Sequence, residues 1–147
     1  MDLKKAFDLI DHNILLKKLK IYFRNKSTVL LFKSYLEKRT QMVYLNDNFS
    51  SEGQIPFGVP QGSILGPILF SLFINDMPLH ISNENTCEMF TDESTLHFSG
   101  KTITEISNIL QSSLNDVNEW CVSNNMVLNP AKTETMLIAT RQKLQLS

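Results

Sequence analysis

One apolar segment, SILGPILFSLFINDM (63–77), constrains the fold of this chain more than any other feature. Its side chains are apolar around most of a helix circumference, which favours deep burial. Pro67 falls in the first turn of the expected helix, where a missing N–H costs little, and Ser63 is the expected cap. The stretch PFGVPQG directly before it is a rigid turn. The chain must therefore pack other elements around this helix.

The composition is typical of one globular domain. The chain has 147 residues, of which 42% are hydrophobic and 20% charged. Its apolar runs are far shorter than the roughly 18 residues that span a bilayer, and Met1 leads directly into DLKKAFD without a signal-peptide core. Cys87 and Cys121 show no CxxC spacing, so we interpret them as reduced thiols. We expect an intracellular protein of the nucleus or cytoplasm, neither secreted nor membrane-bound.

Charge is distributed unevenly along the chain. Residues 1–40 contain ten Lys/Arg and four Asp/Glu, whereas residues 41–147 contain four and eleven. A basic segment can bind the phosphate backbone of a nucleic acid. It can equally form the solvated side of amphipathic helices, which is the commoner case. Charge alone leaves both interpretations open.

Periodicity predicts a mixed architecture. We expect helices over residues 11–23, 27–38, 63–77 and 102–123, with caps at Asp11 or Asn13, at Ser27, and a capping box of Thr102 and Glu105. Residues 41–47 and 54–60 are predicted to be partner strands, CEMFTDESTLHF (87–98) a hairpin, and residues 126–140 a strand, turn and strand. Helices followed by mixed strands and helices favour the α+β class.

Four polar stretches are candidates for chemistry. They are DLKKAFDLIDH (2–12), PFGVPQGSILGP (56–67), the acidic bend of the predicted hairpin, and LNPAKTETML (128–137). Each has an ordinary interpretation when taken alone, as a polar helix start, a rigid turn, a solvated acidic turn or a solvated lysine. Their notable side chains are Asp2, Asp8, Asp11, Gln61, Ser63, Asp92, Glu93 and Lys132.

In this order, the four stretches resemble the reverse transcriptase palm of non-LTR (LINE-like, jockey-type) retrotransposons. DLKKAFDLIDHNILLKKL is similar to the first polymerase motif of that family, and GVPQGSILGPILFSLFINDMP to the second. MFTDESTL resembles its aromatic–Ala–Asp–Asp hairpin, and LNPAKTETM its lysine-bearing motif. The resemblance covers nearly all of the chain. It implies an antiparallel palm-like sheet with packed helices, and a partial reverse transcriptase domain over residues 1–147.

The resemblance also implies the metal chemistry. Two Mg²⁺ (or Mn²⁺) ions about 4 Å apart would activate the primer 3′-hydroxyl and stabilise the leaving pyrophosphate. Asp2 and Asp92 match the carboxylates that hold these ions, and Glu93 stands at the place of a third acid. Lys132 is the candidate acid that protonates pyrophosphate. These four residues are the expected catalytic set.

A nucleotide site follows from the same resemblance. Phe7 matches the aromatic gate that excludes a 2′-hydroxyl, and Pro60, Gln61 and Gly62 would line the nucleotide and the templating base pair. The implied partners are an RNA template, a DNA primer and a deoxynucleoside triphosphate.

The chain departs from the family pattern in several ways. Thr91 and Glu93 stand where the family has Ala and Asp, and the extra methylene of Glu93 displaces its carboxylate. No complete fingers or thumb are expected within the chain, so we predict that it is inactive as an isolated polymerase. The alternative is a non-catalytic retrotransposon relic, inert or weakly nucleic-acid-binding. An unrelated α+β interaction protein is the third hypothesis.

Overall fold

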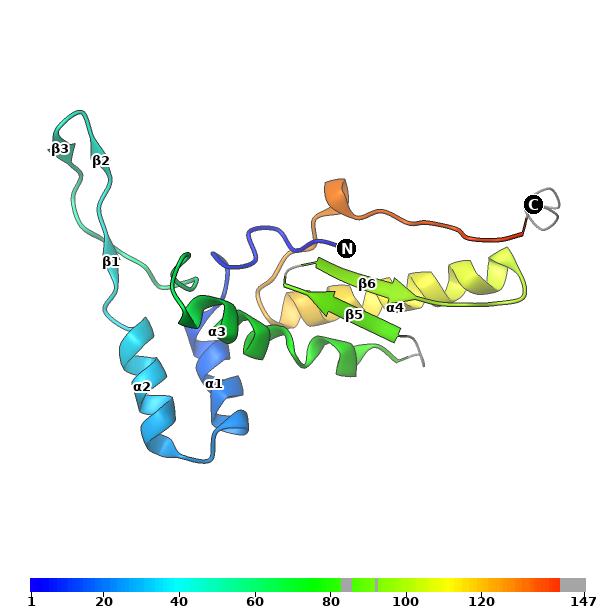
Figure 1. Ribbon diagram of the computed structural model, residues 1–147, viewed down its shortest axis with the longest axis horizontal. Coiled ribbons are helices and arrows are strands. Elements are labelled where there is room, and N and C mark those ends of the chain that lie inside the picture. The colour runs from blue at the N-terminus through cyan, green and yellow to red at the C-terminus, as the bar shows by residue number, and fades with distance from the viewer. Residues whose placement is uncertain (83–85, 92, 141–147) are drawn as a thin grey trace. The chain divides into compact units, whose positions relative to one another are not determined.

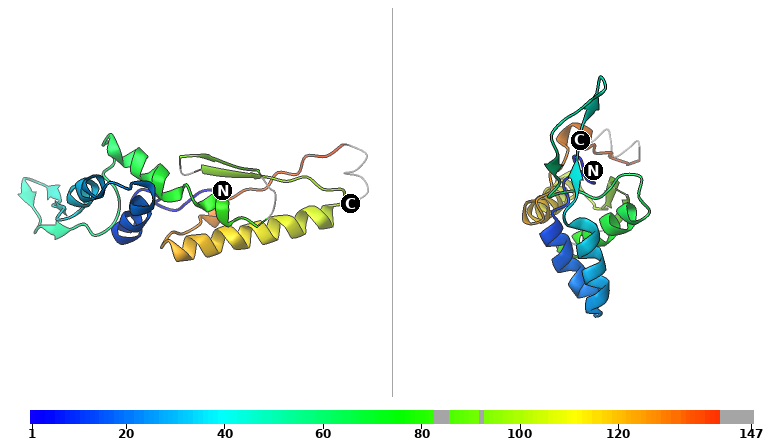
Figure 2. Two further views of the ribbon diagram at one scale, coloured as in Figure 1. Left: turned by 90° about the horizontal axis from the view of Figure 1, so that it is seen from below. Right: turned by 90° about the vertical axis from the view of Figure 1, so that its left-hand side faces the viewer.

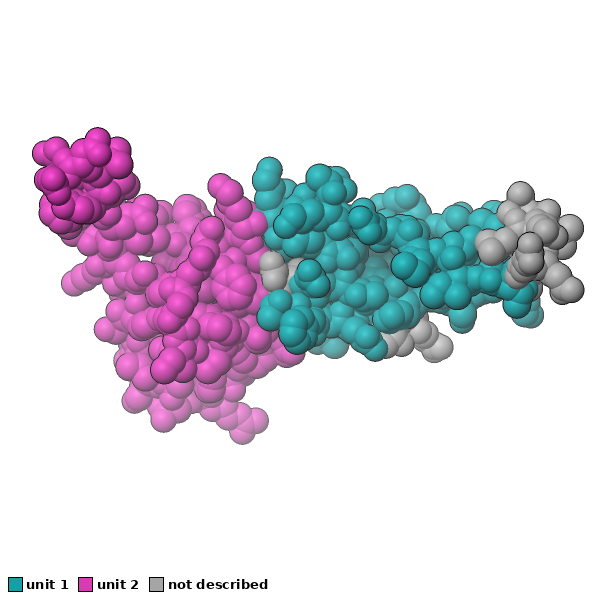
Figure 3. Space-filling model, turned by 45° about the horizontal axis from the view of Figure 1, so that its top comes forward, with its two compact units in different colours: residues 1–4, 76–147 teal, residues 5–75 magenta. Residues whose placement is uncertain are grey.

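A computed structural model describes residues 1–82, 86–91 and 93–140 (Figure 1). The chain divides into two compact units, which are coloured separately in Figure 3. Unit 1 comprises Met1–Lys4 and Asp76–Ser147, and unit 2 comprises Lys5–Asn75. Both combine helices with short antiparallel strand pairs, as the α+β prediction requires. A single domain over residues 1–147 stays a prediction.

Unit 2 contains three helices, α1 (His12–Tyr22), α2 (Lys26–Leu36) and α3 (Leu65–Ile74). Asp11 caps α1 as predicted, because its carboxylate accepts the N–H groups of Asn13 and Ile14 at 2.8 and 3.1 Å. The predicted cap of α2 is wrong. Asn25 caps that helix instead and accepts the N–H of Ser27 at 2.9 Å, so α2 begins one residue earlier than expected.

The core of unit 2 lies between these helices. Its buried apolar side chains are Ala6, Ile10, Leu15, Leu19, Val29, Phe32, Leu36, Val59, Leu69, Phe70, Phe73 and Ile74. Burial around most of α3 was expected, and that expectation is wrong for one face. Pro67, Ile68 and Ser71 are exposed. The helix is therefore buried on one side only, despite its apolar composition.

Two short strand pairs connect α2 to α3. β1 (Thr40–Gln41) pairs with β4 (Gly53–Gln54), and β2 (Tyr44–Leu45) pairs with β3 (Asn48–Phe49). Together the two strand pairs form an arm, residues 40–54, which Figures 1 and 2 show extending away from the helices of unit 2. The predicted strands over residues 41–47 and 54–60 are confirmed only in part. After β4, within the described residues, Phe57 forms an isolated antiparallel bridge with Asp11.

Unit 1 contains the predicted hairpin. β5 (Thr86–Phe90) pairs with β6 (Glu93–His97) in antiparallel register, with Phe90 opposite Glu93. A long helix, α4 (Ile103–Ser123), runs beside the hairpin in Figures 1 and 2. Its buried side chains Ser113, Val117, Trp120 and Cys121 form one stripe.

The N-terminus of α4 is capped nearly as predicted. The hydroxyl of Thr102 accepts the N–H of Glu105 at 3.2 Å, whereas the Glu105 carboxylate accepts the N–H of Lys101 at 2.9 Å. The reciprocal bond is thus shifted by one residue from the expected capping box. At the other end, the buried indole of Trp120 donates to the carboxylate of Asp76 at 3.0 Å, just before the 3₁₀ helix η1 (Met77–His80).

The last segment departs most from the sequence prediction. Leu128 forms an antiparallel bridge with Leu3, and the 3₁₀ helix η2 (Pro130–Lys132) follows. The predicted second strand, within residues 133–140, is absent because nothing in the described ranges offers it a ladder partner. Across those ranges, no helix is both long and apolar enough to cross a membrane.

Candidate active site

Residues 1–4 are held on both sides by antiparallel backbone hydrogen bonds within unit 1. On one side, the N–H of Ser94 donates to the carbonyl of Met1 at 2.9 Å, and Asp2 forms a bridge with Glu93. On the other, the N–H of Asn129 donates to the carbonyl of Asp2 at 2.9 Å. The start of the first motif, within residues 1–4, therefore lies between the acidic hairpin and the lysine-bearing segment.

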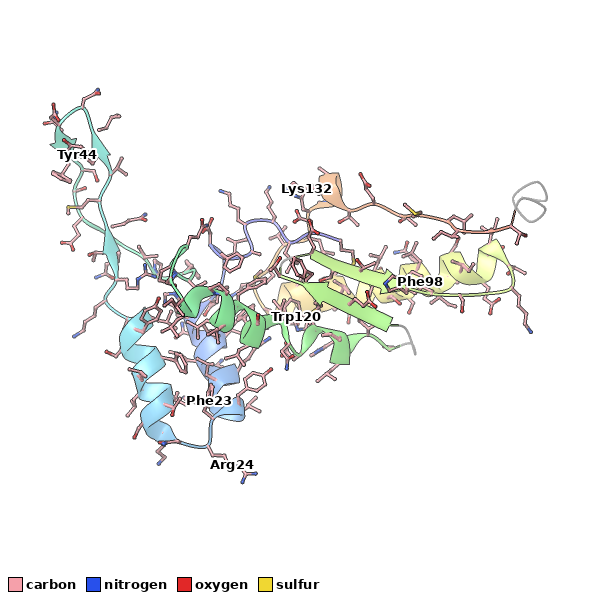
Figure 4. All side chains as sticks on the ribbon, in the orientation of Figure 1. Phe23, Arg24, Tyr44, Phe98, Trp120 and Lys132 are labelled. Carbon is pink, nitrogen blue, oxygen red and sulfur yellow. The ribbon has the colours of Figure 1, made fainter. Side chains whose placement is uncertain are left out.

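The carboxylate of Asp2 is largely buried and has two polar neighbours. Asn129 Nδ2 donates to its Oδ2 at 2.8 Å, and Lys132 Nζ lies 3.9 Å from the same oxygen. The side chain of Asp2 is 15% exposed, whereas that of Lys132 is 71% exposed, so solvent screens this ion pair. Figure 4 labels Lys132 at η2. Asn129 thus orients the carboxylate, and Lys132 adds a solvent-exposed positive charge.

Glu93 stands directly opposite Asp2 in the antiparallel bridge. Directly opposed residues project to the same face, with Cβ atoms about 4.5–5.5 Å apart. The two side chains therefore start from neighbouring positions on one face. Asp92 lies outside the described residues, so its expected separation of roughly 4–7 Å from the carboxylate of Asp2 stays a prediction.

Thr91 introduces backbone strain into the turn of the hairpin. Its φ is 56°, in the left-handed region, which costs a non-glycine residue about 1–3 kcal/mol. Its hydroxyl donates to the carbonyl of Phe90 at 2.7 Å. Such strain in the backbone is typical of functional turns.

The acidic residues that the structure describes fit part of a magnesium site. Mg²⁺ prefers carboxylate oxygens and is usually held by one or two of them together with water and substrate phosphates. Asp2 and Glu93 supply two such groups on one face. Within residues 1–82, 86–91 and 93–140, no cluster of three His, Cys, Asp or Glu forms a complete cation site. The third predicted ligand is Asp92, outside these ranges.

The predicted nucleotide residues lie in unit 2. Phe7 stacks on Phe70 of α3, with ring centroids 4.5 Å apart, and the amide of Gln61 donates to the carboxylate of Asp8 at 2.8 Å. Gly62 has a φ of 78°, which favours glycine at that turn. Since Phe7 and the acidic pair belong to different units, the expected contact of Phe7 with the acidic cluster stays a prediction.

Comparison with known proteins decides the family. Residues 1–146 match the family described as "Reverse transcriptase (RNA-dependent DNA polymerase)". The chain belongs to the reverse transcriptase family.

Relatives among retrotransposons support the same assignment. The chain is 34% identical over 147 residues to the RNA-directed DNA polymerase from mobile element jockey of Drosophila melanogaster, covering 96% of this chain and 16% of that protein. It is 34% identical over 139 residues to the probable RNA-directed DNA polymerase from transposon BS of the same species, covering 90% and 15%. The reverse transcriptase chain thus spans about one sixth of the jockey protein.

A more distant similarity extends beyond insect elements. The putative COX1/OXI3 intron 2 protein of Saccharomyces cerevisiae is 32% identical over 84 residues, covering 57% of this chain and 9% of that protein. The reverse transcriptase family generally uses divalent metal ions.

Sequence reasoning missed Asn129 and His12, and it missed the partner of Asp8. Asn129 binds Asp2, Asp8 binds Gln61, and His12 Nε2 lies 2.7 Å from the carbonyl oxygen of Gly58. Asn129 and His12 had no periodic or spacing signal of their own. Asp8 was noticed as an acid of the first motif, but nothing in the sequence indicated its partner.

Proposed function

We propose that this chain forms the palm part of an RNA-directed DNA polymerase, with Asp2, Asp92 and Glu93 as its metal ligands. The supporting observation is the antiparallel bridge between Asp2 and Glu93, which joins the first motif to the acidic hairpin. The ladder order β5, β6, residues 1–4 and residues 127–129 is compatible with a palm sheet. The bridge thereby places residues 1–4 beside the acidic hairpin, although the two segments are far apart in sequence.

The chemistry assigned to these residues is nucleotidyl transfer. When bound, two divalent ions supply Lewis-acid stabilisation of the attacking and leaving oxygens. Asp2 would hold one or both ions, and the Asn129 amide would keep its carboxylate in one orientation, as outer hydrogen-bond partners do for metal ligands. Lys132 is exposed and close enough to Asp2 to donate a proton to departing pyrophosphate.

The nucleotide would contact unit 2. Its triphosphate and sugar would meet the turn of Pro60, Gln61 and Gly62, and its C2′ would meet the ring of Phe7. The stacked Phe70 limits the movement of that ring. Exclusion of a 2′-hydroxyl needs such a rigid wall, because a mobile side chain would yield to the extra atom.

Primer extension on an RNA template tests this function. The 146 matched residues would replace their counterparts in a jockey-type polymerase, and the chimera would be assayed with Mg²⁺ and dNTP. We expect Asp2→Asn and Asp92→Asn to abolish extension. Glu119→Gln, an exposed residue of α4, is the matched control and should extend like the unchanged chimera. Extension that survives Asp92→Asn would refute the ligand assignment.

A second candidate function rests on the charge of α1 and α2. Residues 12–36 contain six Lys/Arg and no Asp or Glu. Lys17, Lys20, Arg24, Lys26 and Lys33 are exposed. A positively charged surface attracts phosphate groups, so these helices favour weak binding of nucleic acid even without catalysis.

Salt dependence tests the second candidate. Binding of a labelled single-stranded RNA should weaken steeply as salt rises, because each neutralised phosphate releases counterions. A double change, Lys20→Gln with Arg24→Gln, should lower the slope by about one to two units. The matched control is Lys101→Gln in unit 1. Equal slopes for the two variants would exclude α1 and α2 as the binding surface.

A further inference from the structure

The loop of residues 57–62, here called the nucleotide loop, lies directly against residues 7–12 of the first motif within unit 2. The N–H of Gly58 donates to the carbonyl of Ile10 at 2.8 Å, and that of Val59 donates to the carbonyl of Phe7 at 2.9 Å. Gly58 has a φ of 79°, and a Cβ atom there would lie 2.9 Å from the carbonyl oxygen of Asp8. Only glycine allows this close approach.

Two side chains add to these backbone contacts. Asp8 Oδ1 accepts from Gln61 Nε2 at 2.8 Å, and the two residues are 53 positions apart in sequence. His12, a buried residue in the first turn of α1, places Nε2 2.7 Å from the carbonyl oxygen of Gly58. A carbonyl oxygen only accepts, so that nitrogen carries the proton and donates. The loop is thus tied to the first motif at both its ends.

The Asp8 contact fixes which way the Gln61 amide faces. A carboxylate only accepts hydrogen bonds, so the amide nitrogen must face Asp8. The carbonyl oxygen and the second N–H of Gln61 are then directed elsewhere. An exposed glutamine would otherwise sample many rotamers, and this contact removes part of that freedom before any ligand binds.

We propose that Asp8 and His12 are positioning residues for nucleotide binding, Asp8 by orienting the Gln61 amide and His12 by holding the loop at Gly58. This rests on the proposed nucleotide site at residues 60–62. Neither residue touches the nucleotide. Each acts by keeping the loop in its binding conformation, so their loss weakens affinity without removing a ligand contact.

The test measures dNTP affinity of the 147-residue chain in Mg²⁺ by NMR titration. We expect Asp8→Ala to weaken binding about five- to tenfold, as loss of one charge-assisted hydrogen bond implies. Asp8→Asn retains an acceptor oxygen for Gln61 and should bind within about twofold of the parent. His12→Ala should also weaken binding, and His12→Gln, which retains an N–H donor, should restore most of it.

Asp47→Ala is the matched control. Asp47 is an exposed carboxylate of unit 2 that also accepts a side-chain hydrogen bond, from the Tyr44 hydroxyl at 2.7 Å on the β2–β3 hairpin. Its loss should leave dNTP affinity unchanged. An equal loss of affinity in Asp47→Ala and Asp8→Ala would overturn the proposal, since it would indicate a general effect of charge or stability.

A second readout needs no nucleotide. Hydrogen exchange of the Gln61 side-chain amide should accelerate in Asp8→Ala and not in Asp8→Asn, and that of the Gly58 amide should accelerate in His12→Ala and not in His12→Gln. Unchanged exchange in both alanine variants would overturn the positioning roles, as would failure of the conservative variants to restore them. If the parent chain binds no dNTP, the proposed nucleotide site is wrong, and exchange alone decides the contacts.

Discussion

Lys18 is a charged side chain among the buried residues of unit 2. Its Nζ donates to the carbonyl of Phe73 at 2.8 Å and lies 4.7 Å from the centre of the Phe73 ring. Helix α3 has no basic residue in its own last turn. Lys18 therefore brings positive charge from α1 to the C-terminal end of α3, where the helix dipole favours it.

Replacing Lys18 should destabilise the chain. Lys18→Met keeps most of the apolar stem but removes the hydrogen bond from a charged donor to the Phe73 carbonyl, which costs about 1.5–3 kcal/mol. Lys17→Met changes an exposed neighbour and should stay within about 0.5 kcal/mol. Urea unfolding followed by far-UV circular dichroism measures both free energies. Equal values for the two variants would contradict the role assigned to Lys18.

The thiol of Cys121 provides a second prediction for a single residue, and it depends on the burial of that thiol. Burial raises the pKa of its thiol to about 11, because the charged thiolate is poorly solvated there. The folded state therefore keeps a proton that the unfolded state loses near pH 9, and the resulting stabilisation is present below pH 9 and lost as pH rises towards 11. In Cys87→Ser, alkylation of the folded chain at pH 8 should be slow and should accelerate on unfolding. Fast alkylation of folded protein would refute this burial.

The candidate site was only partly predictable from individual residues. The types and order of the polymerase motifs were readable from their resemblance to the reverse transcriptase family, and metal chemistry explains why such motifs contain particular carboxylates. The partners of those residues were not. Asn129 lies 127 positions from Asp2, and Gln61 lies 53 positions from Asp8. Hydrogen bonds between such distant residues leave no local pattern in one sequence.

At the scale of elements, helices were predicted better than strands. The apolar stripes and the Asp11 and Thr102 caps are local signals, and α1 and α4 follow them closely. The strand predicted within residues 133–140 alternates in sequence but has no ladder partner in the described part of the chain. A strand depends on its neighbour, so local sequence alone does not determine it.

The cap of α4 gives a prediction for one element. Thr102→Ala removes the acceptor for the Glu105 N–H and should cost about 0.5–2 kcal/mol. Thr104→Ala lies in the same turn, caps nothing and should be neutral or slightly stabilising, because alanine is the better helix former. Fluorescence of Trp120, the only tryptophan of the chain, reports unfolding of unit 1. A smaller loss in Thr102→Ala than in Thr104→Ala would contradict the cap.

At the scale of the whole molecule, we expect no primer extension by the 147-residue chain alone. It spans about one sixth of the jockey polymerase, and we expect residues outside that sixth to contribute to the positioning of primer and template. Positioning of reactants is worth about 7–11 kcal/mol, and about 1.4 kcal/mol is tenfold in rate. An assay with an RNA template and Mg²⁺ or Mn²⁺ checks this. Extension that disappears in Asp92→Ala would show that the isolated chain suffices.

Metal binding at the paired acids is the central claim, and Mn²⁺ tests it most directly. Paramagnetic Mn²⁺ broadens the NMR signals of nuclei close to it, so titration into the isotope-labelled chain locates the ion without requiring polymerase activity. We predict that the amide signals of Asp2, Glu93 and Ser94 broaden first, and that Asp2→Asn abolishes this, whereas Glu119→Gln has no effect. Broadening that is centred elsewhere, or that is unchanged in Asp2→Asn, would contradict the account.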